Sequence, residues 1–333
     1  MNYIAPMWLP GGQLQTIWPA LYSRRVLGPP PHYHRERWAA PDGDFIDVDW
    51  LSKTRKPGSG AIAASCKTLL VLFHGLEGSS RSHYAEAFAD FAQMHDLAYA
   101  VPHFRGCSGE INRAPRAYHS GDFEEIDWIL KRFHQQWTAQ GGTDVMAVGI
   151  SLGGNALMRW AQEAGSTANN TVRAVASVCS PLDLAASGWA IGRGFNRLAY
   201  TRMFLKTMKP RALQKLEQFP GLFDRGALMA SRDLYEFDNI FTAPLHGFKN
   251  TEDYWGRCSA KPHFHQIRIP ALVVNARNDP FVPAWSLPQP SEVGPQVTLW
   301  QPKQGGHVGF PQGPLPGHVR GMPDAVGGWL LKI

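Results

Sequence analysis

The stretch that decides the fold is Gly-Ile-Ser-Leu-Gly at residues 149–153. An apolar run at residues 145–148 precedes it, and residues 152–164 follow it with the composition of a helix. A G-x-S-x-G pattern between a strand and a helix predicts a sharp turn that strains the backbone of its serine, here Ser151. Small residues must flank such a turn, and the glycines here have no Cβ atom that could clash. We therefore expect the Ser151 hydroxyl to project at the carboxyl end of a sheet, where ligands bind in open α/β folds.

Further apolar runs predict that this sheet contains several buried strands. Residues 68–73 form an almost continuous apolar run, which is typical of a strand covered on both faces. Similar runs lie at residues 97–101, 172–178, 271–274 and 297–301, and helix-compatible segments at 82–94 and 122–137 separate the earlier ones. Strands that alternate with helices predict an α/β protein with a mostly parallel, twisted sheet and helices on both faces.

The alternation stops in the second half of the chain and later resumes, which predicts an insertion into one core. Residues 182–262 carry aromatic residues, Met and Arg at helical spacing, and the segment is too long for a connecting loop. We expect it to form a helical cap. The α/β core would then consist of residues 36–181 and 263–333.

Three shorter segments also have a recognisable character. Residues 1–35 are rich in Pro, Trp and Gly, and they predict an irregular N-terminal arm packed on the core. Residues 45–51 alternate between apolar and acidic side chains, as a half-buried strand does. Residues 53–65 predict an exposed hairpin loop.

Composition limits the kinds of partner. The 333 residues include Lys+Arg 33 and Asp+Glu 27, which gives a formal net charge of +6. No run of Lys and Arg is longer than a pair, so we expect no nucleic-acid partner and interpret the charge as scattered over the surface. Any electrostatic preference would then be for an anionic substrate or for peripheral contact with a membrane surface.

Cysteine usage and the lack of targeting signals favour a cytoplasmic protein. The four cysteines are widely separated and form no CxxC pair, which disfavours a disulfide or zinc framework. No apolar stretch approaches the ~20 residues that span a bilayer, and residues 1–15 lack the layout of a signal peptide. The sequence has no HExxH motif, so we expect no metal and no other cofactor.

A serine hydroxyl becomes a good nucleophile when a base takes its proton, and the partners of a G-x-S-x-G serine follow in the order acid, then histidine. Asp279 comes directly after the apolar run at 271–274, and it precedes a proline that halts regular structure. His307 follows two glycines after the next strand-like run, and these would let it reach Ser151. The competing interpretations are a turn-capping role for Asp279 and an ordinary loop histidine at His307.

An acyl-transfer site also needs donors for an oxyanion. We expect the backbone N–H of Leu152, directly after the serine, to be one donor. The other donor should come from the loop after residues 68–73, where the N–H of Leu76 is the candidate. His74 in the same loop is expected to hydrogen-bond the loop and not to take part in catalysis.

Arg105 follows the strand predicted at 97–101, so its loop should open near the same edge of the sheet. It could bind an anionic group of a substrate. A structural ion pair with Glu110 or Asp122 is the favoured interpretation.

These motifs together resemble one known family. His-Gly-Leu-Glu-Gly at 74–78, His-Phe-Arg-Gly-Cys-Ser-Gly-Glu at 103–110, His-Ser-Gly at 119–121 and Gly-Ile-Ser-Leu-Gly-Gly-Asn at 149–155 resemble the YheT-type α/β-hydrolases. That family is similar to the eukaryotic abhydrolase-domain lipid hydrolases and to the yeast medium-chain ethyl-ester synthases/esterases. The resemblance extends over nearly the whole chain, including the segments around Asp279 and His307.

The resemblance implies a serine hydrolase that cleaves acyl or lipid-like carboxylic esters through an acyl-enzyme on Ser151, with Asp279 and His307 as partners and no cofactor. A small-molecule acyl ester would be its substrate. Two alternatives stay open. One is an alcohol O-acyltransferase or ester synthase that uses the same three residues, and the other is a binding module without catalysis.

Overall fold

The computed structural model describes residues 3–52 and 66–333, so the hairpin loop expected at 53–65 lies outside the described residues. The described chain forms an eight-stranded sheet in the order β1-β2-β4-β3-β5-β6-β7-β8. From β4 to β8 in this order, neighbouring strands pair in parallel. At one edge, β1 pairs antiparallel with β2, and β2 pairs antiparallel with β4. The predicted α/β class with a mostly parallel sheet is confirmed.

All the strands except β1 begin and end close to the predicted positions. Their bounds are β1 Tyr33–Ala39, β2 Phe45–Leu51, β3 Thr68–Phe73, β4 Ala98–Pro102, β5 Asp144–Ile150, β6 Ala174–Val178, β7 Ala271–Val274 and β8 Val297–Trp300. In the parallel register Phe73 pairs with Gly149. The loops that follow β3 and β5 therefore leave the sheet side by side.

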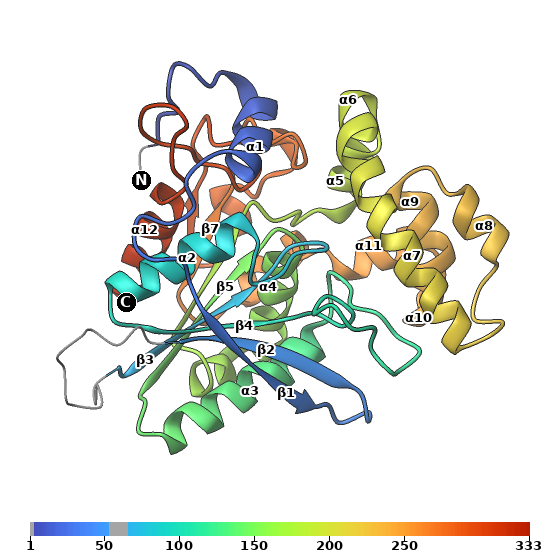
Figure 1. Ribbon diagram of the computed structural model, residues 1–333, viewed down its shortest axis with the longest axis horizontal. Helices are drawn as coiled ribbons and strands as arrows, with labels where there is room; N and C mark the ends of the chain where they lie inside the picture. The colour runs from blue at the N-terminus through green and yellow to red at the C-terminus, as the bar shows by residue number, and fades with distance from the viewer. Residues whose placement is uncertain (1–2, 53–65) are drawn as a thin grey trace.

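Helices cover both faces of the sheet (Figure 1), and the alternation of side chains along a strand explains why the apolar runs are continuous. On β3, Leu69, Val71 and Phe73 face α3 (Phe123–Ala139) and α4 (Leu152–Ala164) in one core cluster. Leu70 and Leu72 face α2 (His83–Met94) and α12 (Gly321–Leu330) in a second cluster. A strand buried on both sides has no position for a polar residue.

The segment between β6 and β7 is helical and lies to one side of the sheet (Figure 1). It contains α5 (Leu184–Ile191), α6 (Gly194–Asn196), α7 (Arg202–Gln218), α8 (Arg225–Ala230), α9 (Leu234–Phe237), α10 (Ala243–Leu245) and α11 (Thr251–Cys258). A π-helical turn, Arg197–Thr201, joins α6 to α7 in αR backbone geometry, so residues 194–218 form one continuous helix. A second π-helical turn, Asp238–Thr242, joins α9 to α10. Short 3₁₀ turns at Gly165–Asn170, Lys261–Gln266, Ala284–Ser286 and Pro290–Glu292 complete the helical elements of the described chain.

Strand β1 was not predicted, because its sequence is largely charged. Its two arginines pair across the strands with the aspartates directly opposite: Arg35 with Asp49 at 2.7 Å and Arg37 with Asp47 at 2.7 Å. Opposite charges at facing positions stabilise an antiparallel pair. This edge strand is therefore held by ion pairs together with the buried side chain of Trp38, which packs in the core.

The prediction that residues 1–35 form an irregular arm is wrong over part of its length, since they contain the helix α1 (Gly11–Leu21). Two glycines at its start and Pro19 inside it hide the helical pattern. Helix α1 packs against the loops that follow β7 and β8, where Gln15 accepts hydrogen bonds from Asn278 and Gly305.

Arg105 forms a structural ion pair as predicted, but the predicted partners are wrong. Its guanidinium contacts Asp44 at 2.7 Å and Glu125 at 2.5 Å. Glu110 instead binds Arg37, and Asp122 binds Arg116. The true partners come from the β1–β2 turn and from α3, so no local spacing could reveal them.

Asp44 organises the long loop between β4 and α3. Its carboxylate accepts hydrogen bonds from the side chains of Arg105 and Asn112 and from the backbone N–H groups of Arg113 and Ala114. Burial alone would raise the pKa of Asp44, but these donors favour the charged form and lower it to about 2. Removing this charge should loosen a loop that borders the site.

We expect Asp44→Asn to lower the free energy of unfolding at pH 7 by about 2 kcal/mol. A depressed pKa adds stability above the ordinary aspartate pKa, near 4, and that stability is lost as the pH falls toward about 2. The variant should therefore lose less stability than the wild type between these pH values. Urea unfolding at several pH values measures both effects, with Glu124→Gln, at an exposed position, as the control. An unchanged acid dependence in Asp44→Asn would contradict this account.

Candidate active site

Ser151 lies in the turn between β5 and α4, with φ 51° and ψ −118°. Positive φ is unusual for a residue with a side chain and is strained for serine. The Ser151 N–H donates to the Val178 carbonyl at 2.9 Å, which ties the turn to the neighbouring strand β6. The predicted strand–turn–helix setting is therefore present.

The glycines around Ser151 are needed because other backbone segments approach too closely. A Cβ on Gly149 would lie 2.4 Å from the Gly154 Cα, and one on Gly153 would lie 2.4 Å from the His74 carbonyl oxygen. A Cβ on Gly154 would lie 2.0 Å from Ser180 Oγ. The sharp turn and the loop after β3 are packed against each other with no room for side chains.

The structure brings together the three residues that the sequence singled out. The Nε2 atom of His307 lies 3.1 Å from Ser151 Oγ, and its Nδ1 atom lies 2.9 Å from Asp279 Oδ2. Asp279 follows β7 and His307 follows β8, so all three stand at the carboxyl edge of the sheet. The other carboxylate oxygen of Asp279 accepts the Phe281 N–H at 2.8 Å, and the Phe281 ring stacks on the imidazole at 4.1 Å between centroids.

Helix α1 holds the loop that carries His307, and no local sequence pattern predicts this contact. The Oε1 atom of the buried Gln15 accepts the Gly305 N–H at 2.9 Å and the Asn278 side-chain amide at 2.9 Å. The backbone N–H of His307 donates to Thr16 Oγ1 at 2.8 Å. The N-terminal segment thus fixes the backbone of the histidine.

The two backbone N–H groups expected to bind an oxyanion lie on either side of Ser151. Leu152 is the first residue of α4, so its N–H has no partner within the helix. Leu76 lies in the loop after β3, where a Cβ on Gly75 would come within 3.2 Å of the Ser151 Cβ. Both leucines line the same cavity as Ser151. Within the described residues, neither N–H donates a hydrogen bond to another residue.

His74 supports this loop through the hydrogen bonds of its buried side chain. Its Nε2 atom accepts the Phe104 N–H at 3.1 Å, so its Nδ1 atom must carry the proton that bonds the Gly75 carbonyl at 2.8 Å. Burial lowers the pKa of His74 to about 3, which keeps the imidazole neutral. The prediction that His74 hydrogen-bonds the loop is confirmed.

Glu77, the next residue of this loop, has a left-handed backbone conformation, with φ 58°. Tyr118 Oη accepts the backbone N–H of Glu77 at 3.0 Å and donates to its Oε1 atom at 2.9 Å. Arg211 of α7 binds the same carboxylate oxygen at 2.9 Å. This network, which the sequence analysis missed, links the helical segment to the loop of Leu76.

Comparison with known proteins agrees with the observed fold. A family model described as "alpha/beta hydrolase fold" matches residues 68–314. The chain belongs to the α/β-hydrolase family. It is 37% identical to the Escherichia coli (strain K12) protein named "Putative esterase YheT", over 95% of this chain and 89% of that one, so the resemblance to the YheT-type hydrolases is confirmed. It is also 26% identical to mouse phospholipase ABHD3, over 86% of this chain and 69% of the relative.

Solved structures show the same fold at low identity. The Pyrococcus furiosus esterase Pf2001 superposes with a TM-score of 0.52 at 15% identity, covering 91% of this hydrolase and 93% of the esterase. Mouse alpha/beta hydrolase domain-containing protein 10 gives 0.52 at 14% identity, over 90% and 99% of the two chains. None of the helices formed by the described residues is long and apolar enough to span a bilayer.

Ser151 opens into a cavity of about 160 Å³ between the hydrolase core and the helical segment. Apolar side chains of that segment provide most of the lining on its side: Leu184, Ile191, Phe204, Met208, Phe237 and Phe241. The charged groups in the wall have partners, since Arg211 binds Glu77, and Lys215 donates to the Asn112 carbonyl at 2.6 Å. The space beside the serine therefore suits an apolar group.

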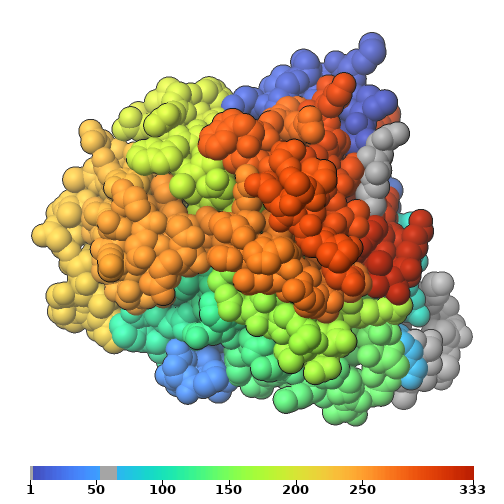
Figure 2. All heavy atoms as spheres, turned by 180° about the vertical axis from the view of Figure 1, so that it is seen from behind, coloured from blue at the N-terminus to red at the C-terminus, as the bar shows by residue number. Residues whose placement is uncertain are grey.

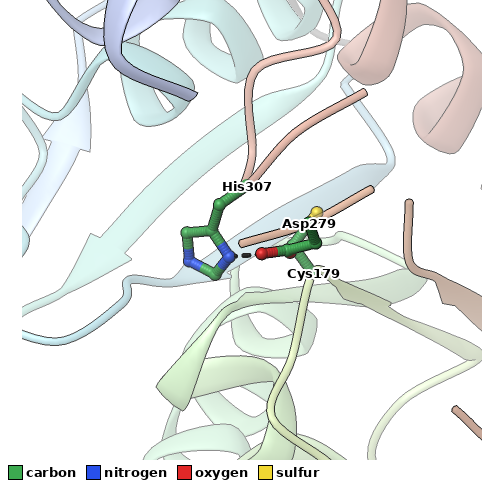
Figure 3. A group of neighbouring side chains, drawn as sticks. All are labelled: Cys179, Asp279 and His307. Atoms are coloured by element: carbon green, nitrogen blue, oxygen red, sulfur yellow. Dashed lines mark hydrogen bonds and ion pairs between the residues drawn. The ribbon is translucent and has the colours of Figure 1, made fainter. Parts of the chain in front are cut away.

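Cys179 completes the surroundings of Asp279 (Figure 3). Among the described residues, Cys179, Asp279 and His307 are the one group whose possible metal-ligating atoms all lie within 4.8 Å of one another. However, the imidazole and the carboxylate already bond each other, and burial raises the pKa of the Cys179 thiol well above its ordinary value. A cysteine side chain must lose its proton and become a thiolate before it can bind a metal. The group therefore does not fit a resident metal site.

The packing around Ser151 makes a direct prediction for stability. Gly153→Ala places a Cβ against the backbone carbonyls of Phe73 and His74, so we expect the free energy of unfolding to fall by at least about 2 kcal/mol. Gly328→Ala in α12 is the matched control, because nothing lies within 4 Å of its added Cβ. It should raise stability by up to about 1 kcal/mol through helix propensity. Thermal unfolding of both variants measures the difference, and equal changes would contradict the proposed clash.

Proposed function

We propose that the protein is a serine hydrolase of carboxylic esters, acting on acyl or lipid-like substrates through an acyl-enzyme on Ser151. The observation that carries the proposal is the continuous chain of contacts from Ser151 Oγ to His307 to Asp279, at 3.1 and 2.9 Å. Each contact lies within the distance needed for proton transfer or for orientation of the base. The serine at the head of this chain borders a mainly apolar cavity.

The mechanism follows from these positions. His307 takes the Ser151 proton as the oxygen attacks the ester carbonyl, while Asp279 holds the imidazole tautomer and stabilises the imidazolium. The N–H groups of Leu76 and Leu152 bind the oxyanion, where each donor is worth roughly 3 kcal/mol. His307 then protonates the departing alcohol, and water cleaves the acyl-enzyme after giving its proton to the same imidazole.

The relatives support ester hydrolysis in general, since they are named as an esterase, as phospholipases and, in yeast, as a monoacylglycerol lipase. The apolar lining adjacent to Ser151 supports an acyl chain as the bound group. An alcohol could replace water in the second step, so acyl transfer is the nearest alternative. Product analysis with added alcohol separates the two, because a transferase would form the new ester in preference to the acid.

Fluorophosphonate labelling tests the nucleophile. We expect the folded wild type to be labelled covalently, and Ser151→Ala to lose all labelling, because the probe reacts only with an activated serine. Ser291→Ala, at an exposed serine, is the control and should be labelled like the wild type. Circular dichroism establishes that each variant is folded. No labelling of the wild type would favour a binding module, and undiminished labelling of Ser151→Ala would exclude this nucleophile.

A panel of p-nitrophenyl esters graded by chain length tests the acyl pocket. We expect Met208→Ala to enlarge the cavity and to shift the preferred acyl chain to a longer one. The ratio of kcat/KM between long and short esters should change roughly tenfold or more, the usual effect of a methylene group in an apolar pocket. Met229→Ala removes the same side chain from an exposed position and should leave the ratio unchanged. Identical chain-length profiles in wild type and Met208→Ala would contradict this pocket assignment.

A further inference from the structure

Part of the helical segment carries many basic residues. They are not adjacent in the sequence, so they form no run of Lys and Arg. Residues 193–216 contain seven basic residues and no Asp or Glu: Arg193, Arg197, Arg202, Lys206, Lys209, Arg211 and Lys215. The seven positive charges of this segment exceed the formal net charge of the whole chain, which is +6. The basic residues are two to five positions apart, and the continuous helix at 194–218 brings several of them to one face.

This helix has two functional faces. On the inner face, Phe204, Met208 and Ala212 line the cavity beside Ser151. On the outer face, Arg197, Arg202 and Lys206 are exposed. None of these three forms an ion pair with another of the described residues, in contrast to the basic residues of the inner face.

Large apolar side chains are interleaved with the outer cations. Phe195 is 55% exposed, Leu198 58% and Met203 53%. The π-helical turn Arg197–Thr201 widens the helix at this point, so positions five apart can share the outer face with the cations. A cationic helix face that also exposes Phe, Leu and Met is typical of helices that lie in the membrane interface.

We propose that this outer face, formed by Phe195, Arg197, Leu198, Arg202, Met203 and Lys206, docks onto an anionic phospholipid bilayer. The cations would contact lipid phosphates, and the three apolar side chains would enter the boundary between head groups and acyl chains. Nucleic acid would use the cations but would leave the apolar side chains in water, so the bilayer is the favoured occupant.

The position of the face in the molecule fits this role. Helix α6 and the start of α7 lie at the upper edge of the helical segment in Figure 1, and the same part of the chain, yellow-green at the upper left in Figure 2, lies on the molecular surface. One helix diameter, about 10 Å, separates the outer face from the cavity wall formed by the same helix. An ester in the bilayer would therefore have a short path to Ser151.

Sedimentation with lipid vesicles tests the docking without any need for catalysis, so the Ser151→Ala protein is used throughout. We expect it to bind vesicles of phosphatidylcholine mixed with phosphatidylglycerol and to bind pure phosphatidylcholine vesicles far more weakly. The triple variant Arg197→Glu/Arg202→Glu/Lys206→Glu should bind the anionic vesicles roughly a hundredfold more weakly. The control triple Lys131→Glu/Lys303→Glu/Lys332→Glu has the same charge change at exposed positions elsewhere and should retain most of the binding.

A second variant, Phe195→Ser/Leu198→Ser/Met203→Ser, separates a bilayer from other anionic partners. It should bind anionic vesicles at least roughly tenfold more weakly while keeping all its charges. Equal binding to neutral and anionic vesicles, or equal losses in the two charge triples, would overturn the proposal. Unchanged vesicle binding by the apolar variant together with tight binding of a DNA duplex would assign the face to nucleic acid. Because binding is read with Ser151 removed, failure of the proposed ester hydrolysis would leave these outcomes unaffected.

Discussion

The backbone of Ser151 can hold its left-handed conformation only because the chain segments around it meet without intervening side chains. Gly149, Gly153 and Gly154 each face a backbone or side-chain atom within 2.4 Å of a hypothetical Cβ. That close approach sets the distance between the loops after β3 and β5, and so the distance between the N–H of Leu76 and the serine. The same close backbone contacts therefore determine both the packing of the sheet and the geometry of the site.

Several titratable side chains around the site are neutral because they are buried. Burial lowers the pKa of His74 to about 3 and raises that of the Cys179 thiol, so both side chains stay neutral near pH 7. Burial likewise lowers the pKa of His83, whose ring bonds the Val308 carbonyl next to His307, to about 4. The interaction between the Asp279 carboxylate and the imidazole of His307 is thus not opposed by a nearby cationic histidine or thiolate.

The fold and the three central residues could be predicted from the sequence because each leaves a local trace. A strand covered on both faces must be apolar throughout, and the serine turn requires glycine at fixed positions. The partners of Arg105, the ion pairs that hold β1, and the support given by Gln15 and Thr16 leave no such trace. Their hydrogen-bond and ion-pair partners lie far away in the sequence, and a polar residue looks the same whether it is solvated or bonded across the molecule. The basic helix face could not be predicted from runs of adjacent charges for a related reason. Its basic residues are separated along the sequence and come together on one face only when the helix forms.

The hydrogen bond from the His307 N–H to Thr16 joins residues 291 positions apart. The proposed general base is therefore anchored by α1, and a fragment without α1 would lose this hydrogen bond together with the one from the Gly305 N–H to Gln15. A ribosome-bound chain would complete the serine turn long before its histidine emerges, and the base would lock only when α1 docks on the finished core. The proposed catalytic histidine would therefore reach its observed place only at the end of folding, well after the serine turn.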